Sequence, residues 1–215
     1  QTESEITFTY TCPAGTNGYP GNLTVNATFG LSEHSTLAVS FSATTDASCP
    51  VNLTHHSYWN LSGNNAEDLG SHWLRISSDE YVETVANIPT GKVLPTTTTD
   101  LDFSDFTQLD SHNWRELDHL YLLTGDSSQI TLMHENSGIQ LDVITMEPAV
   151  QIYAGKFLPS NATTGDSRVG PGRGIAIEPQ HVNELLHGHE KTHTAVLHPG
   201  EIYLNKILYR FSLTN

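Results

Sequence analysis

Residues 23–43 read LTVNATFGLSEHSTLAVSFSA, and two runs within them, 23–30 and 36–43, alternate apolar and polar side chains. Successive side chains of a β-strand point to opposite faces, so this period of two is typical of a strand with one buried face. The polar residues Ser32, Glu33 and His34 separate the two runs. The stretch therefore predicts two neighbouring antiparallel strands of a meander.

Similar runs recur along the chain, whereas helix signals are weak. The further runs span residues 5–10, 74–76, 81–85, 120–123, 130–134, 139–145, 150–154, 174–177 and 202–211. Asn136, Ser137 and Gly138 form a tight hairpin signal. Only residues 104–109 and 183–187 are expected to form single helical turns. Many short strands without a composition shift predict one all-β sandwich domain over residues 1–215.

The charge balance limits the partners. The 215 residues include 9 Lys and Arg against 24 Asp and Glu, a net charge of -15. A surface with so few cations repels phosphate backbones and anionic membranes, so we expect neither nucleic acid nor a membrane as partner. Mean hydropathy is -0.31, and no apolar run approaches the roughly 20 residues of a membrane-spanning helix.

Two adjacent imidazoles stand in the stretch THHSYWN at 54–60. His55 and His56 cannot share one face of a strand, because successive side chains alternate. One of them could line a binding surface together with Tyr58 or Trp59. The alternative is that both histidines only form hydrogen bonds beneath a loop, with the two aromatic rings in the core.

Two carboxylates lie at the ends of apolar runs. Asp118 begins the stretch DHLYLL at 118–123, and Glu178 ends the run GIAIE before Pro179. Burial at the rim of a sheet can raise the pKa of a carboxyl group toward neutrality, which suits a general base. The alternatives are a turn-capping Asp118 and a solvated Glu178.

A group of histidines late in the chain invites a zinc interpretation. His187, His189, His193 and His198 lie close in sequence, but no cysteine or carboxylate lies at a recurrent zinc-ligand spacing. We therefore expect no metal site, and interpret this stretch as a solvated, pH-sensitive loop.

In order and spacing, these patterns resemble the aldose 1-epimerase (galactose mutarotase) family. The resemblance extends over the whole chain. It rests on GYPGNLTV at 18–25, CPVNLTHHSYWNLSG at 49–63, residues 76–81, IPTGKVLP at 88–95, DLDF at 100–103, LDHLYLL at 117–123, EPAVQIYAGKFL at 147–158, GIAIEPQ at 174–180 and LHPGEIY at 197–203.

The resemblance implies a large antiparallel β-sandwich and an isomerase of carbohydrate metabolism that interconverts the α and β anomers of a neutral hexose, glucose or galactose. By position, His56 is the general acid, Glu178 is the general base, and Asp118 and Gln151 bind the sugar. Tyr58 is a candidate for packing on the sugar ring. Neither a metal nor an organic cofactor is implied. A phosphorylated hexose is the less favoured substrate, because basic residues are scarce.

One departure from the family is large. The G-R-x-x-N-R and H-G-G segments that family members carry before the matched region do not occur in these residues. We expect the corresponding N-terminal strands to come from an N-terminal fragment or a second chain that completes the fold, unless the chain is itself a fragment of the enzyme. The alternative function is a secreted, non-catalytic carbohydrate-binding or structural β-sandwich.

Processing signals indicate a secreted glycoprotein, with a cytoplasmic location as the alternative. Sequons occur at Asn22, Asn26, Asn52, Asn60 and Asn161. Three of them lie inside the family-like stretches, so Asn26 and Asn161 are the expected glycosylation sites. The two cysteines, at 12 and 49, could form a disulfide or remain two thiols.

Overall fold

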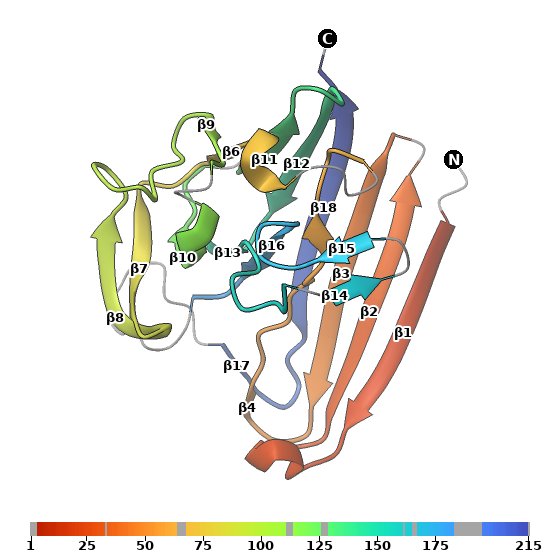
Figure 1. Ribbon diagram of the computed structural model, residues 1–215. Coiled ribbons are helices and arrows are strands. Elements are labelled where there is room, and N and C mark those ends of the chain that lie inside the picture. The colour runs from red at the N-terminus through yellow and green to blue at the C-terminus, as the bar shows by residue number, and fades with distance from the viewer. Residues whose placement is uncertain are drawn as a thin grey trace.

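The computed structural model describes residues 4–32, 34–63, 68–110, 114–125, 129–160, 162–164, 167–182 and 195–214. It confirms the all-β expectation (Figure 1). The larger sheet has eight strands in the spatial order β1-β2-β3-β18-β12-β11-β6-β9. These strands are β1 (Ser4–Cys12), β2 (Leu23–Ser32), β3 (Thr36–Thr45), β18 (Tyr203–Leu213), β12 (Ile139–Thr145), β11 (Ile130–His134), β6 (His72–Ile76) and β9 (Thr107–Gln108).

The second sheet has six strands in the order β5-β16-β13-β10-β7-β8. They are β5 (Tyr58–Trp59), β16 (Ile175–Gln180), β13 (Ala149–Tyr153), β10 (Asp118–Leu122), β7 (Glu80–Val85) and β8 (Ile88–Pro95). Two small strand pairs join β14 (Ala162–Thr164) to β15 (Ser167–Val169) and β4 (Cys49–Pro50) to β17 (Val196–Leu197). The helices in the described residues are three 3-10 turns, η1 (Thr16–Gly18), η2 (Leu69–Ser71) and η3 (Trp114–Glu116). Every strand pairing within these sheets is antiparallel. No described helix is long and apolar enough to cross a membrane.

Most expected strands are confirmed within a few residues. The opening stretch forms β2 and β3, and the signal at residues 136–138 forms the turn between β11 and β12, where Gly138 has a φ of 66°. The helical turn expected at 104–109 is wrong, because Thr107 and Gln108 pair with β6 instead. The turn expected at 183–187 lies outside the described residues. Strand β8 was missed because it carries two prolines and a glycine, which an edge strand tolerates.

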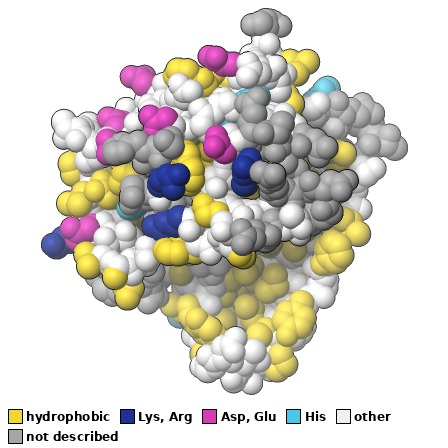
Figure 2. Space-filling model, viewed as in Figure 1, with side chains coloured by type: hydrophobic (Ala, Val, Ile, Leu, Met, Phe, Trp, Pro, Cys, Tyr) yellow, Lys and Arg dark blue, Asp and Glu magenta, His cyan; other side chains and the backbone are white. Residues whose placement is uncertain are grey.

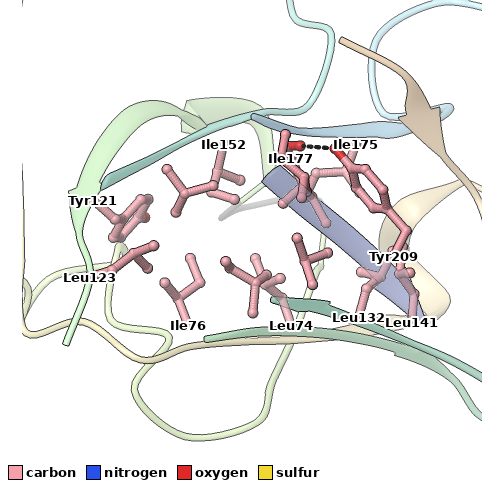
Figure 3. Close-up of a cluster of buried hydrophobic side chains, with 14 of the residues drawn as sticks. Leu74, Ile76, Tyr121, Leu123, Leu132, Leu141, Ile152, Ile175, Ile177 and Tyr209 are labelled. Carbon is pink, nitrogen blue, oxygen red and sulfur yellow. Dashed lines mark hydrogen bonds between the residues drawn. The ribbon is translucent and has the colours of Figure 1, made fainter. Parts of the chain in front are cut away.

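The core lies between the two large sheets (Figure 3). Leu74, Leu132 and Leu141 from the eight-stranded sheet face Ile152 and Ile177 from the six-stranded sheet, and all five are fully buried. Because side chains alternate along a strand, the residues between the core positions of β13 and β16 lie on the opposite face of the six-stranded sheet. That outward face is where the candidate site is found.

The inner face of β1 is apolar, and most of it is exposed. Ile6, Phe8 and Tyr10 on β1 are 56%, 58% and 63% exposed, although they share a face with the core-packed Phe29 and Val25 of β2. Figure 2 shows hydrophobic side chains gathered in the lower part of this view, where these strands lie. The alternation predicted a buried face here, and on β1 that face is exposed.

The outer face of the same strands is polar, as the alternation predicts. Thr7 bonds to Thr28 across the two strands at 2.8 Å, and the Thr9 hydroxyl donates to the Asn26 side chain at 2.7 Å. The sequon residue Asn26 therefore lies on the polar face, on the opposite side of the sheet from Phe8.

The two cysteines are free thiols, so the disulfide alternative is not realised. Cys12 is half-buried at the end of β1, and Cys49 is buried at the start of β4. The Cys49 thiol donates to the Thr45 hydroxyl at 3.6 Å.

Candidate active site

Glu178 lies on β16, on the face of the six-stranded sheet turned away from the core. Its neighbour Ile177 is part of the core, so alternation directs Glu178 outward. The side chain is nevertheless only 10% exposed. Its partner across the ladder is Gln151 on β13, and directly opposed residues share a face.

His56 lies beside Glu178. Strand β5 pairs with β16 through Tyr58 and Ala176, and an antiparallel register extended by two residues places His56 opposite Glu178. The distance from His56 Nε2 to Glu178 Oε1 is 3.3 Å. The imidazole is 53% exposed, so a bound molecule could reach it.

The surroundings of Glu178 favour its neutral form. Burial is the main cause and raises the pKa of the carboxyl group above its ordinary value of 4.5. The His56 imidazole opposes this shift, and the Asp118 carboxylate adds to it. A carboxylate that holds a proton more strongly is a better general base near neutral pH.

Asp118 and Gln151 form the neighbouring part of the site. Asp118 begins β10 and pairs across the ladder with Tyr153. Gln151 Nε2 donates to Asp118 Oδ1 at 2.9 Å, and Lys156 Nζ lies 3.6 Å from Asp118 Oδ2. These two partners orient the Asp118 carboxylate and leave it half-buried at the surface of the sheet.

Aromatic rings border the acid–base pair. The Tyr58 ring lies 5.2 Å from the His56 ring and 6.1 Å from the Tyr153 ring. Burial, and then the nearby Tyr153, Glu178 and Asp118, raises the pKa of Tyr58, so its hydroxyl stays protonated. With 38% exposure, Tyr58 can offer both a ring face and a hydroxyl to a ligand.

The expectation that His55 and His56 face opposite ways is confirmed by their contacts. The His55 ring lies 5.4 Å from the Tyr209 ring and 5.7 Å from the Phe29 ring, on the core side. Burial, with a smaller effect of His56, lowers the pKa of His55. Trp59 also turns to the core, with its ring 5.0 Å from Tyr209, so of the two aromatic candidates only Tyr58 borders the site.

All five expected site residues, His56, Tyr58, Asp118, Gln151 and Glu178, thus meet on one face of one sheet. Sequence reasoning missed two further groups there. Tyr153 could have been found, because it is two residues after Gln151 on the same strand. Lys156 lies in the loop after β13, and no pattern in the sequence indicates where its side chain goes.

The glycosylation and metal expectations concern other parts of the molecule. Asn161 lies outside the described residues, as do His187, His189 and His193 of the histidine-rich stretch. In the described ranges there is no group of three or more His, Cys, Asp or Glu that could hold a metal ion.

The arrangement is suited to moving protons between two oxygens of one small molecule. A buried carboxylate and a reachable imidazole, 3.3 Å apart, can address two atoms that are bonded to the same carbon. The adjacent Asp118 and Gln151 offer hydrogen-bonding groups for hydroxyls, and Tyr58 offers an aromatic face.

Known proteins resemble this chain in sequence. The model of the aldose 1-epimerase family matches residues 1–210. Galactose mutarotase from Homo sapiens is 32% identical over 219 residues, which cover 97% of this chain and 63% of that protein. Aldose 1-epimerase from Escherichia coli K12 is 29% identical over 225 residues, covering 98% of this chain and 65% of that protein. The chain therefore spans just under two thirds of the length of these curated relatives.

Solved structures agree with the sequence comparison. The GalM/aldose epimerase homologue from C. elegans superposes with a TM-score of 0.88 at 30% identity, over 98% of this chain and 66% of that one. Galactose 1-epimerase from Lactobacillus acidophilus has the same fold, with a TM-score of 0.82 at 23% identity, over 99% of this chain and 64% of that one. Because the family model matches residues 1–210 and the fold agrees with that of these relatives, the chain belongs to the aldose 1-epimerase family.

Proposed function

We propose that the protein is an aldose 1-epimerase that interconverts the α and β anomers of a hexose by acid–base opening of the sugar ring. The observation that carries this proposal is the pairing of buried Glu178 with His56 on the face that also presents Asp118, Gln151 and Tyr58.

In the proposed reaction, the Glu178 carboxylate takes the proton of the C1 hydroxyl while the His56 imidazolium donates a proton to the ring oxygen. The bond between C1 and the ring oxygen breaks, and the C1 aldehyde forms. Rotation about the C1–C2 bond presents the other face of the aldehyde. Reversal of both proton transfers closes the ring as the other anomer. The C1 hydroxyl oxygen and the ring oxygen are both bonded to C1, so the acid and the base must lie within a few ångströms of each other, as these two side chains do.

The substrate we propose is a neutral hexose, glucose or galactose. Asp118 would accept hydrogen bonds from sugar hydroxyls, which are strong when the acceptor is charged. The Gln151 carboxamide and the Tyr58 ring would border the same sugar. A net charge of -15 opposes a phosphorylated substrate.

The direct test is polarimetry of freshly dissolved α-D-glucose and α-D-galactose. We expect both to approach anomeric equilibrium faster with the protein than in buffer. The competing function is a secreted, non-catalytic carbohydrate-binding or structural protein. Sugar binding without acceleration, and unchanged by Glu178→Gln, would support that alternative.

We further propose that a strand-forming segment, supplied by an N-terminal fragment, by a second chain or by the same polypeptide, covers the inner face of β1. Two observations support it: the exposure of Ile6, Phe8 and Tyr10 on a face whose pattern is that of a core, and the third of each relative's length that this chain does not match. Exposed apolar faces of this kind are rare on a complete domain.

Phe8→Glu tests this proposal, with Thr7→Glu on the polar face of the same strand as its matched control. In the complete protein, Phe8→Glu is expected to lower the free energy of unfolding by several kcal/mol, because the charge of the new carboxylate would be buried beneath the covering segment. In the 215-residue chain alone both variants should unfold like the unchanged chain. Chemical denaturation measures both.

The intact mass of the native protein completes that test. We expect either one polypeptide heavier than 23.6 kDa or a second, different chain that co-purifies. A native protein of 23.6 kDa without another chain, a dimer of this chain, or a complete protein in which Phe8→Glu behaves like Thr7→Glu would each contradict the proposal.

We also propose that the protein is secreted and carries glycans at Asn26 and Asn161. Asn26 lies on the polar outer face of β2, where a glycan would not enter the core, and its Nδ2 makes only a long contact of 3.4 Å to Ser42. Mass spectrometry of peptides from the native protein should find Asn26 modified. Unmodified Asn26 and Asn161 would contradict secretion through a glycosylating pathway.

A further inference from the structure

The segment that carries His56 lies outside the regular strands. Strand β4 ends at Pro50 and β5 begins at Tyr58, so residues 51–57 join them without belonging to either sheet. The half-exposed His56 side chain is not held in place by burial. Its position beside Glu178 therefore depends on its contacts with the Tyr58 and Tyr153 rings and on how the segment is attached at its two ends.

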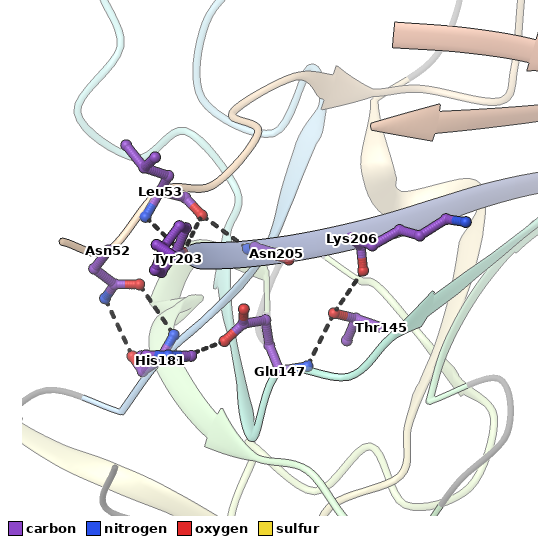
Figure 4. A network of polar contacts seen from close by, with 8 residues as sticks. All are labelled: Asn52, Leu53, Thr145, Glu147, His181, Tyr203, Asn205 and Lys206. Atoms are coloured by element: carbon purple, nitrogen blue, oxygen red, sulfur yellow. Dashed lines mark hydrogen bonds and ion pairs between the residues drawn. The ribbon is translucent and has the colours of Figure 1, made fainter. Parts of the chain in front are cut away.

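The C-terminal attachment is the ladder between β5 and β16, where Tyr58 pairs with Ala176. At the N-terminal end, the Val51 N–H donates to the Ala195 carbonyl at 2.6 Å, and the Asn52 side chain makes two further bonds. Asn52 Oδ1 accepts a hydrogen bond from the His181 backbone N–H at 3.0 Å, and Asn52 Nδ2 donates to the His181 carbonyl at 3.2 Å (Figure 4). We call these two bonds the Asn52–His181 clamp.

The two attachments enclose both members of the acid–base pair. On one segment, His56 lies between Asn52 and Tyr58. On the other, Glu178 lies between Ala176 and His181. Removing the clamp would loosen the N-terminal end of the His56 segment, which Val51 and Leu53 would still hold in part, while the other end stays in the ladder.

The His181 end of the clamp is itself anchored by a buried carboxylate. Glu147 is 6% exposed, and its side chain forms a short contact with His181 Nδ1 (Figure 4). This hydrogen bond raises the pKa of His181 against the opposing effect of burial. The Glu147 backbone N–H donates to the Thr145 hydroxyl at 3.1 Å, which ties the anchor to β12.

The Asn52 end is supported through the next residue. The Leu53 N–H donates to the Tyr203 hydroxyl at 3.1 Å, and Asn205 Nδ2 donates to the Leu53 carbonyl at 2.8 Å. Both partners belong to β18 of the larger sheet. The clamp therefore lies where the two sheets and the His56 segment meet.

We propose that Asn52 is a positioning residue, whose two bonds to the His181 backbone set the distance between the His56 imidazole and the Glu178 carboxylate. The inference rests on the proposed function, because its kinetic consequence requires mutarotation. Asp118 and Gln151 bond to each other on β10 and β13, outside the segment that the clamp holds, so we expect their contacts with the sugar to persist without the clamp.

The kinetic test is Asn52→Ala. We expect kcat to fall by about 10- to 100-fold with KM for the sugar unchanged, since small displacements of a catalytic group cost about that much. Asn22→Ala is the matched control: the Asn22 side chain also makes two bonds, since its Nδ2 donates to Asp46 Oδ2 at 2.6 Å and its Oδ1 accepts from the Ala14 N–H at 3.1 Å, but away from the site. That variant should keep the full kcat. An unchanged kcat, or a raised KM with unchanged kcat, in Asn52→Ala would overturn the proposal.

A second readout does not depend on activity. In the otherwise unchanged chain, Glu178→Gln should shift the imidazole NMR signals of His56, because the carboxylate lies 3.3 Å away. In the Asn52→Ala background this response should be much smaller. A shift of the same size in both backgrounds would contradict the positioning role of Asn52, even if the protein showed no mutarotase activity. A shift that is lost in the Asn52→Ala background of a protein without mutarotase activity would contradict the proposed function alone.

Asn52→Asp keeps the test decisive if the alanine variant does not fold. Aspartate keeps the acceptor for the His181 N–H and loses the donor to the His181 carbonyl. Its kcat and the shift of its His56 signals on Glu178→Gln should both be smaller than those of the unchanged protein. Values equal to those of the unchanged protein would count against the proposal.

Discussion

Replacing Glu178 with glutamine is expected to lower kcat for mutarotation by about 10²- to 10⁴-fold, the usual contribution of one acid–base group, with little change in KM. Glutamine keeps the size of the side chain and one acceptor oxygen, but it cannot take the proton of the C1 hydroxyl. Because Glu178 is buried beside His56, no solvent-exposed carboxylate can readily replace it there. Polarimetry at several sugar concentrations separates kcat from KM.

Glu83→Gln is the matched control for this variant. Glu83 lies on β7 with its carboxylate 3.7 Å from Lys92 Nζ, next to the edge strand β8 and three strands away from β16. It should keep the full activity and melt like the unchanged protein. Full activity in Glu178→Gln would show that another group is the base.

The pH dependence of kcat/KM tests the same role without changing the fold. The base must be unprotonated, so kcat/KM should fall as the pH decreases through the pKa of Glu178. Burial raises that pKa, so the acidic limb should lie above the ordinary glutamate value of 4.5. Asp118→Asn removes a charge that raises this pKa, and should move the limb to lower pH. An acidic limb at or below the ordinary value would contradict the assignment of Glu178.

His56→Gln is expected to have an effect of the same order, a decrease in kcat of about 10²- to 10⁴-fold. Glutamine can still donate a hydrogen bond to the ring oxygen, but it cannot transfer a proton to it. The ring oxygen would then leave as an unprotonated alkoxide, which raises the barrier to ring opening. Polarimetry and NMR of the anomeric protons measure the rate.

Two further variants test this prediction. His198→Gln changes an exposed histidine that bonds to Ser48 at 2.8 Å, outside the site, and should leave the rate unchanged. The double variant with Glu178→Gln should be little slower than either single variant, because an acid and a base that act together lose their joint contribution once. Independent losses that multiply in the double variant would mean that the two residues do not act in one step.

Much of the fold could be predicted from local pattern. Alternation over residues 23–43 predicts β2 and β3, and it also predicts which of their side chains share a face. This prediction succeeds because the direction of a side chain on a strand depends only on its parity along the chain. His55 and His56 also face opposite ways, although residues 51–57 belong to no strand.

Local pattern failed where a partner from elsewhere decided the conformation. Residues 104–109 show weak helical character, yet Thr107 and Gln108 add to the edge of β6. Strand β8 contains prolines, which argue against a strand because they lack the backbone N–H. At the edge of the sheet these N–H groups are not required, because an edge strand has a neighbour on one side only.

The sequence by itself determined the all-β class, the family and five candidate site residues, because these follow from side-chain alternation and from motifs that are contiguous in the chain. Only the tertiary structure decided that Glu178 is buried 3.3 Å from His56, that Lys156 borders Asp118, and that Asn52 clamps His181. The raised pKa of Glu178 depends on its burial and on His56 and Asp118, which come from other parts of the chain. Asn52 and His181 are likewise 129 positions apart. No local pattern encodes such a contact, since it forms only when the strands that carry its two ends are brought side by side.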